Sequence, residues 1–481
     1  MTGISQIKVL TVEEVDTIYD KSLELLSRKG VKIDHPQALK MLDKAGAQVD
    51  FDSRQVRFPR DIIEMALQKV PHSVTLASRN ERKDIILPNP ASMFYTRNGS
   101  GALNYLDPES NTYRDMTLAY VKKCGQLMET LDQIDICAFP SPRDVPEETA
   151  DIHALKALLE STSKHINIQP YSVEGVKYLL ELGTAVAGSK EALRKEPIIS
   201  LTPNAFSPLA IKDVDTEIIV QATRYGVPLQ VATLPSAGAT SPATIAGTVL
   251  QTSIELLAMI VVIQLMNPGN PVFAFPCLFT TDMVTGRSLQ STVEAVLADM
   301  AIVQFIKDAF HVPVNVYAFG TDSAIPDGQS MIETTLQGLL ISEAGSDILS
   351  GAGMVDSFLG ISPVQMVIDN MLVGILKRIN SGVKVDDDTL AWEEIFDTVP
   401  MSGHYLERAH TLKHCRDAIR PELFVRASAQ VWRLEGGKDL YARALDRYKE
   451  LEKKLKPLEI PKEVQREINR VVEQADECLA K

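Results

Sequence analysis

The fold is decided between Met93 and about Asn380, where eight short apolar runs recur at intervals of roughly 31 to 43 residues. They are MFYTRNG (from Met93), IDICAF (Ile134), HINIQP (His165), PIISLTPNAF (Pro197), PLQVATLPSAG (Pro228), PVFAFPCLF (Pro271), PVNVYAFGTDS (Pro313) and DILSGAG (Asp347). A helix-like stretch follows each run, and strands that alternate with helices form parallel sheets. Eight such units predict a (β/α)8 TIM barrel, an α/β fold whose active site lies on the loops after the strands.

Helical extensions flank the predicted barrel. Residues 1–92 contain a helix capped by Thr11, a shorter helix in HPQALKMLDKAG, and a small β hairpin formed by SVTLA and DIILP. A second hairpin is expected between Gly99 and Thr117, close to the barrel mouth. We therefore expect a helical N-terminal extension (1–92), a catalytic barrel (93–380) and a helical C-terminal region (381–481). Pro457 and Pro461 should divide the tail into two helices. The apolar stripe of the tail should pack against its own barrel or against a sister subunit, which is compatible with a homo-oligomer.

Composition excludes several classes of function. The chain has 49 basic and 63 acidic residues, and the lack of a basic stripe argues against a nucleic-acid partner. The N-terminus has no signal sequence, and the longest apolar run, Leu256 to Ile263, is too short to cross a membrane. Five scattered cysteines make a disulfide framework improbable. These features favour a protein of the reducing cytoplasm.

Aromatic residues gather at the predicted strand ends, although they make up only 6% of the chain. Any one of them is more often ordinary packing, but the group favours a box that faces a ligand. Clustered aromatic faces suit a quaternary ammonium, at about 0.5–2 kcal/mol per face. Because side chains alternate along a strand, Tyr317 and Phe319 should point the same way. The candidate residues are Phe94, Tyr95, Tyr105, Phe206, Phe275, Phe279, Tyr317 and Phe319.

Polar residues are expected at the same end of the barrel. Gly238 suggests a tight loop, and Gly351 and Gly353 can present backbone N–H groups to an anion, although loop turning explains such glycines equally often. The polar candidates are Arg97, Asn98, Gln169, Thr202, Asn204, Ser236, Thr321, Asp322, Ser323 and Gln329.

Motifs for nucleotides and metals are missing from the sequence. There is no GxGxxG in a first βα turn, no GxxxxGK[ST], no HExxH and no CxxC. His410 and His414 have the spacing of metal ligands but lie beyond the barrel, where capping or surface roles are more common. Cys137 and Cys277 have no histidine partners in the sequence. We therefore predict no metal site.

Four stretches carry a family resemblance: AFSPLAIKDVD, LPSAGATSPATIAG, GTDSAIPDGQS and GHYLERAHTLKH. Through them nearly the whole chain resembles the trimethylamine methyltransferase (MttB-like) family. The resemblance implies a barrel that demethylates a methylated amine and passes the methyl group to Co(I) of a separate, cognate corrinoid protein docked over the mouth. No cofactor would then be bound permanently, because the partner supplies the cobamide. We expect Ser236, Gly238, Gly351 and Gly353 to face it, and Asp322, Ser323 and Gln329 to orient the substrate.

One difference from the founding members of this family indicates to which of its subclasses the chain is similar. The founding trimethylamine enzymes contain pyrrolysine, whereas this chain has standard residues only, with Ala324 the nearest candidate for that position. Members without pyrrolysine are similar to glycine betaine methyltransferase. A quaternary ammonium already carries its positive charge and leaves as a neutral amine, so the protein need only orient it and exclude water. A close carboxylate would over-stabilise the ground state, so Asp322 is assigned first to loop structure or to the cobamide side, and Arg97 can receive a substrate carboxylate.

Two other functions remain open from the sequence. The chain can be a non-catalytic binder of quaternary amines or a regulatory relative, or a zinc-dependent transferase that acts on the corrinoid. The sequence does not choose among glycine betaine, proline betaine, carnitine and related compounds.

Overall fold

The computed structural model describes residues 6–80, 84–397 and 404–480. Its centre is a barrel of eight parallel strands in which each strand pairs with the next. The ring closes where β20 pairs with β6 and where a bridge joins Ala274 to Val314. The predicted (β/α)8 barrel is therefore confirmed. Its strands are β6 (Tyr95–Asn98), β9 (Ile136–Ala138), β10 (His165–Ile168), β11 (Ile199–Leu201), β14 (Leu229–Thr233), β16 (Val272–Pro276), β19 (Asn315–Tyr317) and β20 (Ile348–Ala352).

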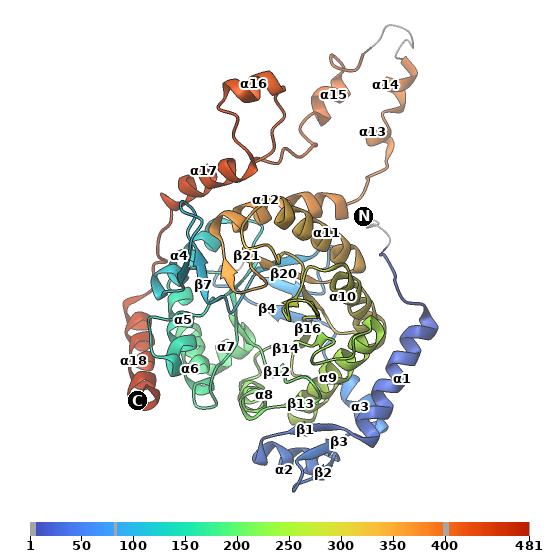
Figure 1. Ribbon diagram of the computed structural model, residues 1–481, viewed down its shortest axis with the longest axis vertical. Coiled ribbons are helices and arrows are strands. Elements are labelled where there is room, and N and C mark those ends of the chain that lie inside the picture. Colours follow the sequence, from blue (N-terminus) through green and yellow to red (C-terminus); the bar gives the residue numbers. More distant parts are fainter. Residues whose placement is uncertain (1–5, 81–83, 398–403, 481) are drawn as a thin grey trace.

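A helix follows every barrel strand, and Figure 1 shows these helices as a ring around the sheet. Hydroxyl or carboxylate side chains cap several of them, such as Thr244, Thr292 and Asp327. The helices are α4 (Leu118–Thr130), α5 (Ala150–Leu159), α6 (Val176–Ala187) with the short α7 (Lys190–Lys195), α8 (Asp213–Tyr225), α9 (Ile245–Met266), α10 (Val293–Phe305), α11 (Gly328–Ala344) and α12 (Pro363–Asn380).

Helix α9 differs from its sequence-based description. The apolar run at Leu256 to Ile263 belongs to a helix of 22 residues, which by length and composition could cross a membrane. However, 78% of its most apolar window is buried inside the protein. It is apolar on all sides because it packs against the barrel strands on one side and α1 and α3 on the other.

The N-terminal elements include a sheet that the sequence did not reveal. They are α1 (Val12–Arg28), β1 (Val31–Ile33), α2 (Pro36–Lys44), β2 (Gln48–Asp50), β3 (Gln55–Arg57) and α3 (Arg60–Leu67). Thr11 caps α1 as expected, in a capping box with Glu14. Strand β1 also pairs with β13 (Ala210–Ile211), which lies in a barrel loop far along the chain. Such a long-range pairing leaves no local signal in the sequence.

The first predicted hairpin closes one end of the barrel. It consists of β4 (Val74–Leu76) and β5 (Ile85–Leu87), although residues 81–83 of its turn lie outside the described residues. Its apolar side chains pack against Ile136, Phe273 and Ile348, which lie on barrel strands. Because Ile136 and Ile348 begin their strands, the hairpin covers the N-terminal end and leaves the C-terminal end for a site.

The second predicted hairpin, β7 (Asn104–Leu106) and β8 (Tyr113–Asp115), is also present. It joins β21 (Met354–Val355) and β22 (Gly360–Ile361), which follow the last barrel strand. A second small sheet lies beyond the same ends of the strands and contains β15 (Ser236–Ala237), β17 (Phe279–Thr281) and β18 (Ser288–Leu289). These two sheets form part of the rim of the barrel mouth.

The C-terminal residues are helical, as predicted, and Pro457 and Pro461 separate the last two helices. Helix α17 (Leu440–Glu452) packs on α12, and α18 (Lys462–Leu479) packs on α6 and α5. Before them come four short helices, α13 (Asp387–Leu390), α14 (Trp392–Asp397), α15 (Ala409–His414) and α16 (Ala429–Leu434). In Figure 1 this segment extends outward from the ring beyond α12.

The buried carboxyl of Asp369 on α12 generates a prediction about stability. It accepts hydrogen bonds from Gly353 N at 2.7 Å and Gln365 Nε2 at 2.8 Å, yet burial raises its pKa to about 7. The native state thus keeps a proton that the unfolded chain releases near pH 4. As the pH rises from about 4 to about 7, the free energy of unfolding should therefore fall by up to about 1.4 kcal/mol per pH unit because of this group.

Asp369→Asn should therefore flatten the dependence of stability on pH. We expect its slope between pH 5 and pH 7 to be smaller than that of the parent by about 1 kcal/mol per unit, measured by urea denaturation. The exposed Asp52→Asn serves as the control and should keep the parent slope. Equal slopes for parent and Asp369→Asn would contradict a raised pKa at this position.

Candidate active site

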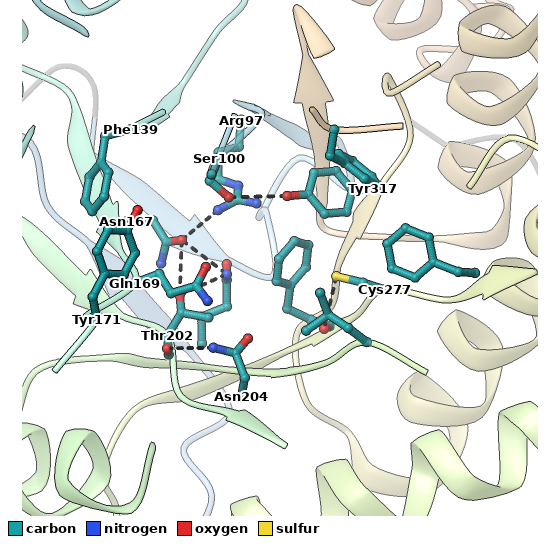
Figure 2. A pocket seen from close by; sticks show the side chains of 16 residues that line it. Arg97, Ser100, Phe139, Asn167, Gln169, Tyr171, Thr202, Asn204, Cys277 and Tyr317 are labelled. Carbon is teal, nitrogen blue, oxygen red and sulfur yellow. Dashed lines mark hydrogen bonds between the residues drawn. The ribbon is translucent and has the colours of Figure 1, made fainter. Parts of the chain in front are cut away.

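A cavity of about 200 Å³ lies at the C-terminal ends of the barrel strands. It is smaller than the roughly 300–1,000 Å³ clefts that hold drug-sized ligands, so it suits a small molecule. Figure 2 shows its side chains converging from different strands. The lining residues are Arg97, Ser100, Gly101, Phe139, Asn167, Gln169, Tyr171, Thr202, Asn204, Gln230, Leu234, Phe275, Cys277, Phe279, Tyr317 and Phe358.

Several residues that the sequence singled out line this cavity together. Each lies in or just after a barrel strand, where the parallel arrangement brings the strand ends to one place. They are Arg97, Gln169, Thr202, Asn204, Phe275, Phe279 and Tyr317.

The other aromatic candidates lie elsewhere. Phe94 and Tyr95 are at the opposite end of the barrel, because β6 starts there. Tyr105 is buried in the hairpin sheet and stacks on Tyr120 with ring centroids 4.0 Å apart. Phe206 is exposed, with Lys212 over its ring.

Phe319 does not point the same way as Tyr317, contrary to the expectation from strand alternation. Strand β19 ends at Tyr317, and Ser350 O accepts hydrogen bonds from both Ala318 N and Phe319 N. This break in the regular pairing ends the alternation of side chains. Phe319 is fully buried and lies against Gly338 of α11, whereas Tyr317 lines the cavity.

The remaining polar candidates hold loops together. Asn98 Nδ2 donates to Ala138 O at 2.8 Å, and its Oδ1 accepts from Ala138 N. Asp322 accepts from Gln290 N, Ser291 N and Ser357 Oγ. This is the loop role to which the sequence first assigned it. Ser323 Oγ donates to Asp327, and Gln329 Nε2 donates to Glu333 on the exposed face of α11.

The four residues expected to face the cobamide have local roles in the rim. Ser236 Oγ lies 2.8 Å from Thr281 Oγ1, and Gly238 turns the chain with a φ of +88°. At Gly351, φ is +103° and a Cβ would lie 2.8 Å from Gly320 N, so a side chain there would clash with backbone. Gly353, with φ +85°, donates its N–H to Asp369. Their contact with a cobamide stays a prediction.

Aromatic rings form two groups on the cavity wall. One group is a chain in which Phe275 and Tyr317 have ring centroids 5.1 Å apart, Tyr317 and Phe358 4.2 Å, and Phe358 and Phe279 5.6 Å. The other is the edge-to-face pair of Phe139 and Tyr171 at 6.2 Å. Figure 2 shows this pair on the far side of the cavity from Tyr317. A small cation between them would meet aromatic surfaces from two directions.

Three residues of the cavity wall, Phe139, Tyr171 and Phe358, were not among the residues predicted from the sequence. The sequence contained a signal for the first two, because residues that directly follow a barrel strand lie at the barrel mouth. Phe139 follows β9 directly, and Tyr171 lies three residues after β10. Phe358 had none. It lies in the loop after β20 with a left-handed φ of +73°, a position that only the tertiary structure defines.

Arg97 is the one formally charged residue among the described residues that line the cavity. Its side chain is buried, and its guanidinium lies 4.7 Å from the ring centroid of Phe275 and 5.8 Å from that of Tyr317. Nε donates to Ser350 Oγ at 2.9 Å and Nη1 to Asn167 Oδ1 at 2.7 Å, while Nη2 has no hydrogen-bond partner. Burial lowers the pKa of Arg97. Arginine nevertheless stays charged in proteins, so the site carries a cation with one free donor group.

A layer of polar side chains inside the barrel holds Arg97 in place. Asn167 Oδ1 also accepts from Thr202 Oγ1 and Gln230 Nε2, both at 3.2 Å. Ser350 Oγ donates to Asn315 Oδ1 at 2.5 Å, and Asn315 Nδ2 donates to Gln230 Oε1 at 2.8 Å. These residues alternate with apolar ones along their strands, a signal that the sequence contained. The network fixes the guanidinium without a carboxylate.

Burial disfavours the charged forms of two titratable groups beside the site. Cys277 is buried, and desolvation raises the pKa of its thiol well above the usual range. Desolvation likewise raises the pKa of Asp299, which lies close to Cys277, well above that of an exposed carboxyl. The thiol is therefore neutral near pH 7, and burial disfavours the charged form of Asp299. Among the described residues that line the cavity, the formal charge is that of Arg97.

Within the described residues, no group of three or more His, Cys, Asp or Glu side chains could hold a metal ion. The histidine pair singled out by its spacing lies in the segment beyond the barrel. The rings of His410 and His414 lie in a tilted arrangement with centroids 4.4 Å apart. His410 Nε2 lies 3.0 Å from Asp388 O, and His414 Nδ1 lies 2.6 Å from Asp417 Oδ2.

Comparisons with known proteins agree with this architecture. A family model described as trimethylamine methyltransferase (MTTB) matches residues 1–479. The chain is 29% identical to the trimethylamine methyltransferase MttB of Desulfitobacterium hafniense (strain DSM 10664 / DCB-2), over 97% of this chain and 93% of that protein. It is 24% identical to the glycine betaine methyltransferase of D. hafniense (strain Y51), over 89% and 88%.

Among solved structures, the monomethylamine methyltransferase MtmB of Methanosarcina barkeri is similar in fold. The TM-score is 0.55 at 11% sequence identity, and the match covers 95% of this chain and 91% of that one. This likeness concerns the fold alone. The family model, in contrast, spans almost the entire chain. The protein is therefore a methyltransferase that belongs to the trimethylamine methyltransferase family.

Proposed function

We propose that this protein transfers a methyl group from a quaternary amine with a carboxylate, similar to glycine betaine, to Co(I) of a cognate corrinoid protein. The observation that carries the proposal is the charge pattern of the cavity. Aromatic rings surround one buried guanidinium with a free Nη2, and no carboxylate is among the described residues that line it. A betaine offers a carboxylate for Arg97 and a cation for the rings.

Electrostatics argues against a substrate that is only cationic. Two like charges in a small, poorly hydrated cavity repel one another more strongly than they do in water. A carboxylate on the substrate cancels the charge of Arg97 and directs the ammonium group away from it. The pair of Phe139 and Tyr171 and the rings of Phe279 and Phe358 then remain available for the methyl groups, because Arg97 already lies over Phe275.

The chemistry of a quaternary amine matches what this site offers. The cobalt supplies the electron pair that forms the new Co–CH₃ bond and becomes Co(III). The N–CH₃ bond breaks, and nitrogen keeps its bonding pair and leaves as a neutral tertiary amine. No proton moves, so no general acid is needed. The opposite charges of Co(I) and nitrogen disperse in the transition state, which a site with little water favours.

A tertiary amine would need prior activation. The family members with pyrrolysine carry a residue that this chain lacks, and Ala324, the nearest candidate for its position, lies outside the cavity lining. The 24% identity to a glycine betaine methyltransferase supports the quaternary substrate, and the 29% identity to a trimethylamine methyltransferase supports the shared type of transfer. We expect the reaction to occur in the cytoplasm.

The direct test combines the protein, glycine betaine and a reduced corrinoid protein. We expect the Co(I) absorption to convert to that of methyl–Co(III), with formation of the tertiary amine. Proline betaine, carnitine, choline and trimethylamine complete the panel. Amine binding without conversion would instead identify a binder or regulatory relative. Turnover of trimethylamine but of no quaternary amine would refute the proposal, and stoichiometric zinc would favour a zinc-dependent transferase.

Arg97→Ala should separate betaines from simple cations. Loss of a charge-assisted contact should weaken betaine binding by about 10- to 100-fold. Choline binding should stay equal or improve, because a like charge is removed. Isothermal titration calorimetry measures both affinities. Arg97→Lys keeps the positive charge but lacks the planar guanidinium, so its affinity for the betaine should lie between those of the parent and Arg97→Ala. A parallel loss for betaine and choline would show that Arg97 only supports the structure.

Phe358→Leu should reveal the contribution of an aromatic face. We expect binding of the betaine to weaken by about 2- to 30-fold. Binding of 3,3-dimethylbutanoate, a carboxylate in which an uncharged tert-butyl group replaces the trimethylammonium group, should change less. Phe206→Leu is the matched control, because Phe206 is an aromatic outside the cavity and 54% exposed. Equal effects of the two substitutions, or an equal loss for both ligands, would argue against a cation site at Phe358.

A further inference from the structure

One loop of the cavity wall has an unusual backbone conformation. It joins β21 to β22 and consists of residues 356–359. Asp356, Ser357 and Phe358 have φ angles of +53°, +48° and +73°. Residues other than glycine rarely adopt this left-handed region, and a bulky residue such as phenylalanine is a clear exception there. Three such residues in succession make the loop a strained segment, which persists only where its surroundings hold it.

The strained loop places Phe358 over a buried part of the cavity wall. The ring centroid of Phe358 lies 4.2 Å from that of Tyr317 and 5.6 Å from that of Phe279. Phe279 and Phe358 are both partly buried, and they pack against a buried cluster that contains Tyr317 and Cys277. Figure 2 shows Tyr317 and Cys277 on the same side of the cavity. Phe358 thus lies between this cluster and the solvent.

Hydrogen bonds attach the start of the loop to the segment after β19. Asp356 N donates to Ser323 O at 2.8 Å, and Ser357 N donates to Thr321 O at 3.0 Å. The hydroxyl of Ser357 donates to Asp322 Oδ1 at 2.7 Å. These contacts fix the first two residues of the loop, and Phe358 follows them directly in the chain. The position of its ring therefore depends on whether these two residues keep their left-handed conformation.

Arg287 contacts the same loop from the neighbouring hairpin of the rim. It directly precedes β18, which pairs with the strand that carries Phe279. Arg287 Nη2 donates to Asp356 Oδ1 at 2.7 Å and to Ser357 Oγ at 3.4 Å. The side chain of Arg287 is 46% exposed, so this ion pair lies on the solvent side of the rim. The two hairpins therefore meet twice, through the rings of Phe279 and Phe358 at the cavity and through this ion pair at the surface.

The balance of these interactions favours a wall that opens over a wall that is fixed. An ion pair with one partner half exposed contributes little in water, and the strain of three residues opposes it. In a permanently closed wall, glycines would adopt the same φ angles without steric strain. Because the closed conformation is favoured only slightly, a small change at the ion pair should shift the populations of the closed and open conformations.

We propose that residues 356–359 form a gate of the cavity and that Arg287 is the positioning residue that keeps it closed. The ion pair of Arg287 with Asp356 holds the strained conformation, in which Phe358 covers Cys277. When the ion pair breaks, the loop relaxes to an ordinary backbone conformation and Phe358 leaves the wall. The amine enters and leaves through the open gate, and the closed gate excludes water during the methyl transfer. This inference does not depend on which amine the cavity holds.

The thiol of Cys277 reports the opening of the gate without any substrate. The full chain is treated with iodoacetamide, a small neutral reagent, and mass spectrometry follows the labelling of each cysteine. Because burial raises the pKa of this thiol, the reaction is run at about pH 9. Cys277 should react slowly in the parent and about 2- to 5-fold faster in Arg287→Ala, which loses a partly exposed ion pair. Cys124 and Cys137, which are buried outside the cavity lining, should keep their parent rates.

A double-mutant cycle tests whether Arg287 acts through Phe358. Phe358→Ala removes the ring that covers Cys277, so labelling should be fast whether or not Arg287 is present. Arg287→Ala should therefore add nothing in that background, although it speeds labelling in the parent. Arg287→Lys keeps the positive charge and should retain most of the protection. Arg60→Ala, which breaks an exposed ion pair with Glu64, is the matched control and should have no effect.

Any of three results would overturn the proposal. The first is an equal rate of Cys277 labelling in the parent and in Arg287→Ala. The second is a parallel rise at Cys124 and Cys137, which would indicate a general loosening of the fold. The third is an equal effect of Arg287→Ala with and without the ring of Phe358, which would show that Arg287 does not act through that ring. The identity of the substrate affects none of these results, and the cobalt assay tests it separately.

Discussion

The site depends on one buried positive charge that the protein does not neutralise. A buried guanidinium is costly unless hydrogen bonds or an opposite charge compensate it. Arg97 has two neutral acceptors, Asn167 and Ser350, and the faces of two rings, but Nη2 is left without a partner. The hydrogen bonding of this buried guanidinium is thus incomplete at the centre of the barrel. A ligand with an anionic group would complete it.

The polar layer below the cavity is explained by the need to hold the buried guanidinium of Arg97 without neutralising its charge. TIM barrels are usually filled by branched apolar side chains. Here Asn167, Gln230, Asn315 and Ser350 occupy interior positions and bond to one another as well as to the arginine. A network of neutral amides and hydroxyls orients a guanidinium without cancelling its charge. A carboxylate in that position would have held Arg97 more firmly and would have left nothing for a substrate anion.

The aromatic walls have a complementary role. They exclude water, and they attract the cationic end of a zwitterion without forming an ion pair with it. Because no carboxylate is among the described residues that line the cavity, and burial disfavours the charged forms of Cys277 and Asp299, a quaternary ammonium would not be held too tightly in its ground state. Binding at one end of the substrate and chemistry at the other are therefore separated within one small cavity.

The sequence by itself determined the elements whose signals are local. The spacing of apolar runs identified all eight barrel strands, capping residues and prolines marked helix ends, and strand ends pointed to Arg97, Phe275 and Tyr317. Only the tertiary structure decided which side chains meet. It brought Phe139, Tyr171 and Phe358 to the cavity, placed Phe94 and Tyr95 at the opposite end, and turned Phe319 into the core. The reason is that the cavity combines residues from eight separate segments. In addition, a shift of one residue in strand register, or the loss of one pairing, changes the face on which a side chain lies.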